Sequence, residues 1–92
     1  KYVLMDLKTV NIGDVKMNLA NMLRSLRKRN SMTRAELAEE LGVSRITIQN
    51  IETAQNVTID TLLKVLQYFE LLENFNDFIS EERNNNAYGS LY

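Results

Sequence analysis

The chain has 92 residues, of which 45% are apolar and 25% are charged, and this length fits one small domain with little room for a second core. It contains no cysteine and no histidine, which excludes disulfide bonds, Cys- or His-based zinc sites and catalysis by either side chain. The net charge is −1, but residues 24–34 carry only bases and residues 70–82 only acids. A nearly neutral total therefore conceals a basic face and an acidic end.

The beginning of the chain is rich in apolar and β-branched residues. Their alternation in residues 1–12, KYVLMDLKTVNI, is imperfect. It favours an extended arm, with a strand that pairs with another chain as one form of it and a short helix as the alternative. We therefore assign residues 1–13 to an N-terminal arm.

A first helix is predicted after this arm. Asp14 is expected to cap it, and the helix should run to about Arg29, because residues 30–31 are polar and end the periodicity. The positions expected to face inward are Val15, Leu19, Met22, Leu23 and Leu26.

Two short helices joined by a tight turn are predicted in the segment TRAELAEELGVSRITIQNIET. Thr33 and Glu36 have the spacing of a capping box, and Ser44 is suited to cap the second helix. Gly42 is expected to take a positive φ in the turn. The positions expected to face inward are Leu37, Ala38, Leu41, Ile48 and Ile51. This pattern is typical of a helix-turn-helix, whose second helix normally enters the major groove of DNA.

Two further helices complete the prediction. Thr58 is expected to cap a helix over about residues 59–70, and a last short helix is expected around residues 73–79. The buried stripe of the longer one should consist of Ile59, Leu62, Leu63, Leu66 and Phe69. Residues 81–92 have no periodicity and are predicted to be a flexible tail. The predicted fold class is therefore all-α, with five helices in a domain over residues 14–80.

Three segments carry a family resemblance: LRSLRKRNSMT, RAELAEELGVSRITIQNIE and TIDTLLKVLQYF. In this order and spacing, residues 19–69 resemble the helix-turn-helix domain of the phage repressor superfamily (Cro/CI-like, XRE-type). The resemblance implies a five-helix lambda-repressor-like fold and a repressor that binds a palindromic operator as a homodimer. We accordingly expect a cytoplasmic protein of a bacterium or phage, without metal, cofactor or membrane association. A domain that has kept this fold without binding DNA is the alternative.

Side chains that would read bases can be chosen from the second helix of the motif. With Ile48 and Ile51 facing inward, the residues left facing outward or at the margin are Arg45, Ile46, Thr47, Gln49 and Asn50. Arg45 can bond bidentately to guanine, Asn50 to adenine, and Ile46 can contact a thymine methyl group. The alternative for Ile46 is a residue half-buried against the turn. In the resembling repressors nearly the same positions read bases.

Phosphate contacts are expected from helix N-termini and the following loop, where free N–H groups and hydroxyls favour anions. The candidates are Thr33, Arg34, Ser44, Asn56 and Thr58. The family usually has Gln where this chain has Arg34, which adds a cation within reach of phosphate. It commonly has Gly where this chain has Ala54, so we expect the left-handed residue of that turn to move to Asn56.

Two further expectations come from the resemblance. Arg27 and Glu52 are expected to form a structural ion pair that fixes the first helix against the recognition helix. Phe75 and Phe78 are interpreted first as core residues; the alternative, which the resemblance supports, is a dimer surface.

A second function is also considered. The additional residues at both ends and the segment LLENFNDFISEE make the chain loosely similar to HipB-type antitoxins. Such a protein would neutralise a partner toxin and autoregulate its operon. An enzyme is not expected, because no His, Cys or Gly-rich phosphate loop is present to organise a catalytic site.

Overall fold

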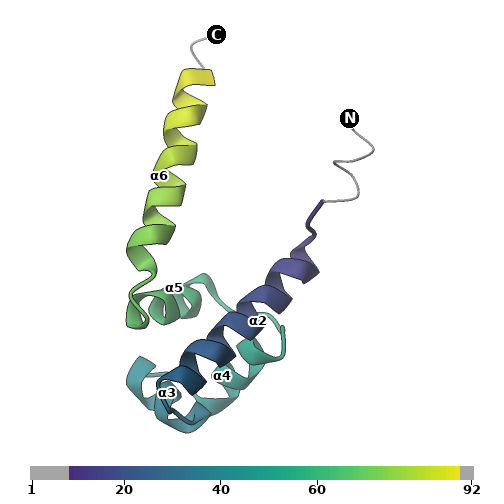
Figure 1. Ribbon diagram of the computed structural model, residues 1–92, viewed down its shortest axis with the longest axis vertical. Helices are drawn as coiled ribbons and strands as arrows, with labels where there is room; N and C mark the ends of the chain where they lie inside the picture. Colours follow the sequence, from purple (N-terminus) through teal and green to yellow (C-terminus); the bar gives the residue numbers. More distant parts are fainter. Residues whose placement is uncertain (1–8, 90–92) are drawn as a thin grey trace. The chain divides into compact units, whose positions relative to one another are not determined.

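The computed structural model describes residues 9–89 of the chain, and Figure 1 shows its five helices. They are α2 (Ile12–Arg29), α3 (Arg34–Leu41), α4 (Arg45–Glu52), α5 (Ile59–Tyr68) and α6 (Leu72–Gly89). No strand occurs within residues 9–89. The prediction of an all-α fold with five helices is confirmed over residues 9–89, and most of the predicted arm, with its strand, lies outside these described residues. The chain divides into two compact units, one ending at Val57 and the other beginning at Thr58.

Helix α2 begins earlier than predicted. The side chain of Asn11 accepts a hydrogen bond from the backbone N–H of Asp14 (2.8 Å), and the Asp14 carboxylate accepts one from the N–H of Asn11 (3.2 Å). Asn11 is therefore the cap and Asp14 is its capping-box partner, so the prediction that Asp14 caps the helix is wrong. Both residue types are good caps, and the reciprocal pair of bonds decides between them.

The buried face of α2 is also rotated relative to the prediction. Ala20, Leu23 and Arg27 are buried, whereas Val15 is 48% exposed. The other predicted positions, Leu19, Met22 and Leu26, are half-buried. The residues that α2 buries against its neighbours thus include an arginine, which apolar periodicity alone does not select.

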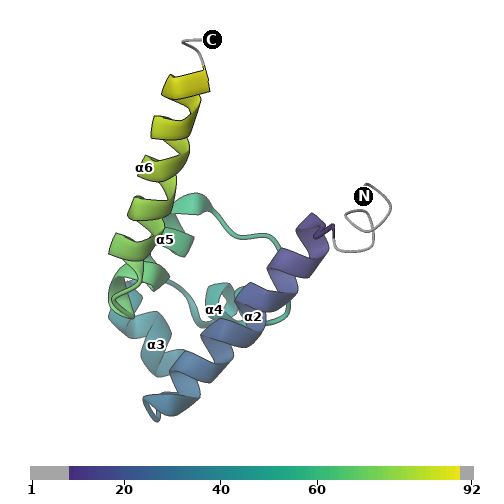
Figure 2. The same ribbon diagram turned by 45° about the horizontal axis from the view of Figure 1, so that its top comes forward.

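The first unit is centred on α4, which packs against both α2 and α3 (Figures 1 and 2). Leu23, Leu37 and Ile48 are almost completely buried, and Ala38 is buried as well. Each fully buried leucine or isoleucine contributes about 1.5–3 kcal/mol, so these few residues hold the three helices together. A small side chain at position 38 suits two short helices that cross closely.

The turns that follow α2, α3, α4 and α5 share one geometry. Each contains a residue in the left-handed region, at Ser31 (φ 55°), Gly42 (φ 69°), Ala54 (φ 60°) and Glu70 (φ 61°). The next N–H reaches back to the last turn in all four, for example from Val43 to the Ala38 carbonyl (3.0 Å). This is the Schellman motif, which satisfies carbonyls that a helix end leaves free.

Two predictions about these turns have opposite outcomes. The positive φ of Gly42 is confirmed. The expected shift of the left-handed residue from position 54 to Asn56 is wrong, because Ala54 itself has a φ of 60°. The motif requires this conformation at the second residue after Glu52, whatever side chain stands there, and a non-glycine residue is held in it at a cost of about 1–2 kcal/mol.

Helix α5 opens the second unit. The Thr58 hydroxyl accepts a hydrogen bond from the N–H of Thr61 (3.2 Å), so the predicted cap is confirmed. The helix ends at Tyr68, because Glu70 takes the left-handed conformation. Its buried residues are Thr61, Val65 and Leu66, while Ile59 is 71% exposed, so the predicted stripe is only partly correct.

Helix α6 packs against α5 and continues to Gly89. The prediction of a short last helix is wrong, and so is the prediction of an irregular tail for residues 81–89. No proline or glycine precedes Gly89 in this helix, so nothing in its backbone chemistry ends it sooner. Phe75 is half-buried and Phe78 is 58% exposed, which excludes Phe78 from the core of its unit.

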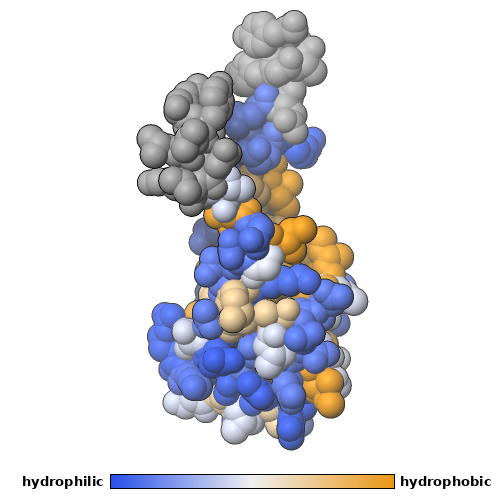
Figure 3. Space-filling view, turned by 90° about the vertical axis from the view of Figure 1, so that its right-hand side faces the viewer, coloured by the Kyte–Doolittle hydropathy of each residue, from blue (hydrophilic) through white to orange (hydrophobic). Residues whose placement is uncertain are grey.

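The surface carries several large apolar side chains. On the face drawn in Figure 3, hydrophilic residues predominate and apolar ones form separate patches. The strongly exposed apolar residues among those described are Val10, Ile12, Val15, Met17, Ile46, Ile59, Tyr68, Phe78 and Ile79. Of these, only Ile46 belongs to the helix-turn-helix.

Candidate nucleic-acid interface

The start of α4 is built by two hydroxyl side chains. The Ser44 hydroxyl accepts a hydrogen bond from the N–H of Thr47 (3.1 Å), which confirms Ser44 as the cap. The two hydroxyl oxygens lie 2.9 Å apart and share a hydrogen bond. Thr47 is thus oriented by the cap. These two bonds join the cap to the first turn of α4, from which the outward side chains project.

The predicted base-contact residues all lie on α4. Arg45 and Ile46 are exposed, whereas Thr47, Gln49 and Asn50 are half-buried along the same helix. Ile46 is 62% exposed, so the alternative of a residue half-buried against the turn is wrong. Ile48 and Ile51 are buried as predicted. The five side chains therefore share one element, and their contact with bases remains a prediction.

The other end of α4 is anchored by Glu52, whose side chain is fully buried. Arg27 donates to both carboxylate oxygens, from Nε to Oε2 (2.7 Å) and from Nη2 to Oε1 (2.9 Å). A third guanidinium bond, from Nη1 to the Met32 carbonyl (2.9 Å), ties the same arginine to the turn after α2. The Arg27–Glu52 ion pair is present as predicted, with the bidentate geometry that is the strongest form of such a pair.

Two more arginines join this pair. Arg34 donates from Nε to Glu52 Oε1 (3.0 Å), and Arg24 donates from Nη2 to the backbone carbonyl of Glu52 (2.8 Å). The second bond satisfies a carbonyl at the C-terminal end of α4, where a cation is favoured. Arg24 Nε also lies 3.9 Å from Glu52 Oε1, so three cations surround one carboxylate and this arginine cluster (Arg24, Arg27, Arg34) keeps a surplus of positive charge.

The ionisation of Glu52 reflects two opposing causes. Burial disfavours the charged carboxylate, but hydrogen bonds from Arg27 and Arg34 and their charges outweigh it, and the pKa of Glu52 is lowered. The hydrogen bond to Glu52 correspondingly raises the pKa of Arg27. The pair is therefore charged at neutral pH.

The predicted phosphate contacts lie at three helix starts and in one loop. Thr33 and Ser44 cap α3 and α4. Glu36 completes the capping box of α3, and its hydrogen bonds with the Thr33 backbone and hydroxyl lower the pKa of Glu36. Thr58 caps α5 in the second unit, and the Asn56 side chain accepts a hydrogen bond from Lys16.

Arg34 has a different environment from the one expected. Its Nε is used by Glu52, and its side chain is 32% exposed, so only the remaining guanidinium N–H groups are available to a phosphate. It also lines an open hollow of about 500 Å³, called here the arginine hollow. The lining residues are Arg27, Met32, Thr33, Arg34, Ala35 and Arg45. The hollow joins the start of α3 to the start of α4 and is bordered by three cations.

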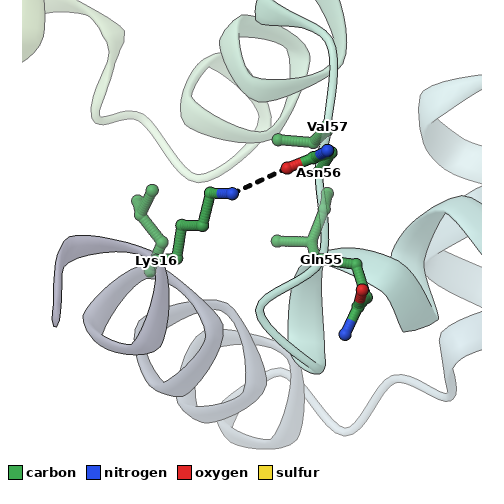
Figure 4. A pocket seen from close by; sticks show the side chains of 6 residues that line it. Lys16, Gln55, Asn56 and Val57 are labelled. Atoms are coloured by element: carbon green, nitrogen blue, oxygen red, sulfur yellow. Dashed lines mark hydrogen bonds between the residues drawn. The ribbon is translucent and has the colours of Figure 1, made fainter. Parts of the chain in front are cut away.

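Sequence reasoning missed two cations at this site. Arg24 was seen only as part of a basic run, and Lys16 was not considered. Lys16 Nζ donates to Asn56 Oδ1 (2.6 Å) across 40 residues of sequence, as Figure 4 shows. Helical spacing carries no signal for such a contact, because it depends on how α2 packs against α4.

Known proteins resemble this chain over the same region. A family model described as helix-turn-helix matches residues 23–72, more than half of the chain. The chain belongs to the helix-turn-helix family. Antitoxin HipB of Escherichia coli is 41% identical over 54 residues, which cover 58% of this chain and 61% of that protein. Antitoxin HipB of a second Escherichia coli strain is 39% identical over 54 residues, covering 58% of this chain and 57% of that protein.

A solved structure is also similar to this chain. The chain superposes on an MDT Protein with a TM-score of 0.55 and 38% sequence identity, covering 61% of this chain and 80% of that one. The chain spans about three fifths of the length of the curated HipB relatives it matches. Among residues 9–89, no helix is long and apolar enough to cross a membrane.

Proposed function

We propose that this protein is a sequence-specific DNA-binding regulator, a repressor that reads a palindromic operator as a homodimer through α4. One observation carries the proposal: exposed Arg45 and Ile46 begin a helix whose far end is held by buried Glu52. A recognition helix needs this combination, because its N-terminal side chains must reach base edges while its backbone stays fixed.

Each outward side chain has chemistry that suits a base edge. Arg45 offers a guanidinium fork for O6 and N7 of guanine, and Asn50 offers an amide for adenine. Ile46 offers an exposed apolar surface that suits a thymine methyl group. Thr47 and Gln49 lie beside them on the helix.

Backbone contacts would come from the capped starts of α3 and α4. Both Thr33 and Ser44 stand where helix N–H groups and the helix dipole favour an anion. The arginine hollow between them supports a phosphate contact by Arg34 and Arg45. Asn56, in the loop after α4, and Thr58, the cap of α5, remain proposed contacts.

A dimer is proposed because one such helix contacts too few bases for high specificity. Two copies related by a two-fold axis would place their α4 helices about 34 Å apart, one turn of DNA. Exposed Phe78 and half-buried Phe75 on α6 are the proposed dimer surface. The protein would act in the cytoplasm of a bacterium or phage host.

The test is selection of preferred DNA from a random pool, followed by affinity measurements on the selected site. Arg45→Ala should weaken binding to that site by about 1–3 kcal/mol and relax the preference at one base pair. Arg83→Ala, an exposed arginine of α6, is the matched control and should retain the preference. Equal affinity of the unchanged protein for random and selected DNA rejects the proposal.

A second candidate function is that of an antitoxin, which would neutralise a partner toxin and autoregulate its operon. The observation that favours it is the 41% identity to Antitoxin HipB over 54 residues. Co-expression with the product of the adjacent gene, followed by purification, distinguishes the two. An antitoxin should co-purify with that product and abolish its toxicity, whereas a simple repressor should purify without it.

A further inference from the structure

The loop after the recognition helix is linked to the beginning of α2 by one polar contact. Lys16 Nζ donates to Asn56 Oδ1 over 2.6 Å, and this bond lies at the surface. A lysine ammonium has three N–H donors, of which this contact uses one. The Asn56 amide accepts through its oxygen, so its NH₂ group stays on the side away from Lys16 (Figure 4).

These two side chains stand at the rim of a small hollow. It measures about 230 Å³ and is lined by Lys16, Leu19, Ile51, Gln55, Asn56 and Val57. Figure 4 shows the Gln55 side chain pointing away from Lys16, so the polar groups of the lining that face each other are the ammonium and the Asn56 amide. Leu19, Ile51 and Val57 supply the apolar part of the lining. N–H donors beside apolar side chains suit a phosphate that carries a sugar better than a free phosphate ion, which is hydrated on all sides.

This hollow and the arginine hollow lie toward opposite ends of α4. The arginine hollow lies at the start of α4, with Arg45 in its wall, whereas the Lys16 hollow contains Ile51 and the loop residues that follow the end of α4. Helix α4 has 8 residues and is about 12 Å long at a rise of 1.5 Å per residue, and the two hollows contain residues from its opposite ends. Phosphates line both edges of the major groove that receives such a helix, so an anion site near each end of α4 can meet a backbone phosphate.

We propose that the Lys16–Asn56 hollow binds a backbone phosphate of the DNA, on the groove edge opposite the one that the arginine hollow binds. The proposal rests on the proposed DNA-binding function and adds Lys16 as a positioning residue. Two anion sites at the two ends of α4 would fix how deeply and at what angle the helix enters the groove. Asn56 then has two tasks: it orients the ammonium and donates to the same phosphate.

The test is the salt dependence of binding to the DNA selected by the unchanged protein. Each neutralised phosphate contributes about 0.9 to the slope of log K against log salt, so Lys16→Met should reduce that slope by about 0.9. The affinity should fall by a similar factor on selected and random DNA, because a phosphate contact carries no sequence information. Lys16→Arg should keep the slope. Asn56→Ala should weaken binding and leave the slope close to that of the unchanged protein, because it removes no charge.

The matched control is Lys28→Met on the same helix. Lys28 is exposed and lines neither hollow. It lies 12 residues from Lys16, about 18 Å along α2 and well beyond the Debye length of about 10 Å at 0.1 M salt. The salt slope of DNA binding by Lys28→Met should match that of the unchanged protein. Thermal unfolding of each variant verifies that the variant is folded.

The outcomes separate this inference from the proposed function. If the unchanged protein prefers its selected site but Lys16→Met leaves the slope unaltered, the inference is overturned and DNA recognition by α4 stands. Titration of the free protein with inorganic phosphate adds the second arm. The hollow is a site for a free phosphate if inorganic phosphate shifts the amide signals of Gln55 and Asn56 while Lys16→Met leaves the salt slope of DNA binding unchanged. This result also overturns the inference.

Discussion

The two units of the chain treat their charged and apolar side chains in different ways. In the unit that ends at Val57, Leu37 and Ile48 are inaccessible and an ionised carboxylate, Glu52, is buried among arginines. In the unit that begins at Thr58, Ile59 and Phe78 are largely exposed, and the acids of α6 among the described side chains lie at the surface. In the first unit, buried apolar side chains and the arginine bonds to Glu52 thus hold α4 in place. The second leaves an apolar and acidic helix face open, and the proposed dimer surface lies on it.

The largest expected effect is on the buried charge of the first unit. Glu52→Gln keeps the shape of the side chain but leaves Arg27 buried without its counter-charge, which should lower the free energy of unfolding by about 3–5 kcal/mol. Denaturant unfolding measures it. Glu73→Gln in α6 is the matched change at an exposed acid and should alter stability by less than about 0.5 kcal/mol. Equal effects of the two substitutions contradict the comparison.

Truncation of an apolar side chain should likewise cost more stability in the first unit than in the second. Leu37→Ala creates a cavity in a fully buried site and should cost about 2–5 kcal/mol. Phe78→Ala removes a larger but mostly exposed side chain, and its cost to the monomer should be under about 1 kcal/mol. Thermal unfolding at low protein concentration compares them. A loss at Phe78 as large as that at Leu37 shows that Phe78 is a core residue after all.

The pH dependence of stability should sharpen the contrast further. The pKa of Glu52 is lowered in the folded protein, so its contribution is fully present above the ordinary value of 4.5 and is lost as pH falls through the lowered folded value. In that window, stability should fall more steeply for the unchanged protein than for Glu52→Gln, by at most about 1.4 kcal/mol per pH unit for one proton. Unfolding curves of both proteins, recorded as the pH is lowered from 5, measure this difference. Equal pH dependence of stability in the two proteins contradicts the expectation.

The smallest expected effect lies in the turns on either side of α4. Gly42→Ala should destabilise by about 1 kcal/mol, because position 42 has a φ of 69° and an added Cβ meets no atom within 4 Å, so the cost is purely in the backbone. Ala54→Gly should stabilise by a similar amount, since Ala54 has the same conformation without the freedom of glycine. Melting temperatures of the two variants should shift in opposite directions.

Local signals in the sequence predicted much of the helix-turn-helix. Thr33, Ser44 and Thr58 cap the expected helices, and Gly42 takes the expected left-handed conformation. These features depend on hydrogen bonds within three or four residues, so their sequence pattern contains their cause. The Arg27–Glu52 pair was expected from family resemblance and is present.

The errors occur where a local pattern allows two answers. Asn11 and Asp14 are both good caps, and the last helix has no residue that stops it before Gly89. Ile59 fits a helical apolar stripe and is nevertheless exposed. Periodicity records which residues share a face, but it does not record whether another element covers that face.

The sequence by itself determined where most helices begin, how the turn after α3 is made and which side chains of α4 face outward. Only the tertiary structure decided that Arg24 and Arg34 join Glu52 and that Lys16 reaches Asn56. The physical reason is the range of the interactions. Caps and turns are satisfied by neighbours in the chain, whereas these charges meet only after α2 and α3 have packed against α4, which places residues 18 to 40 positions apart within hydrogen-bond distance.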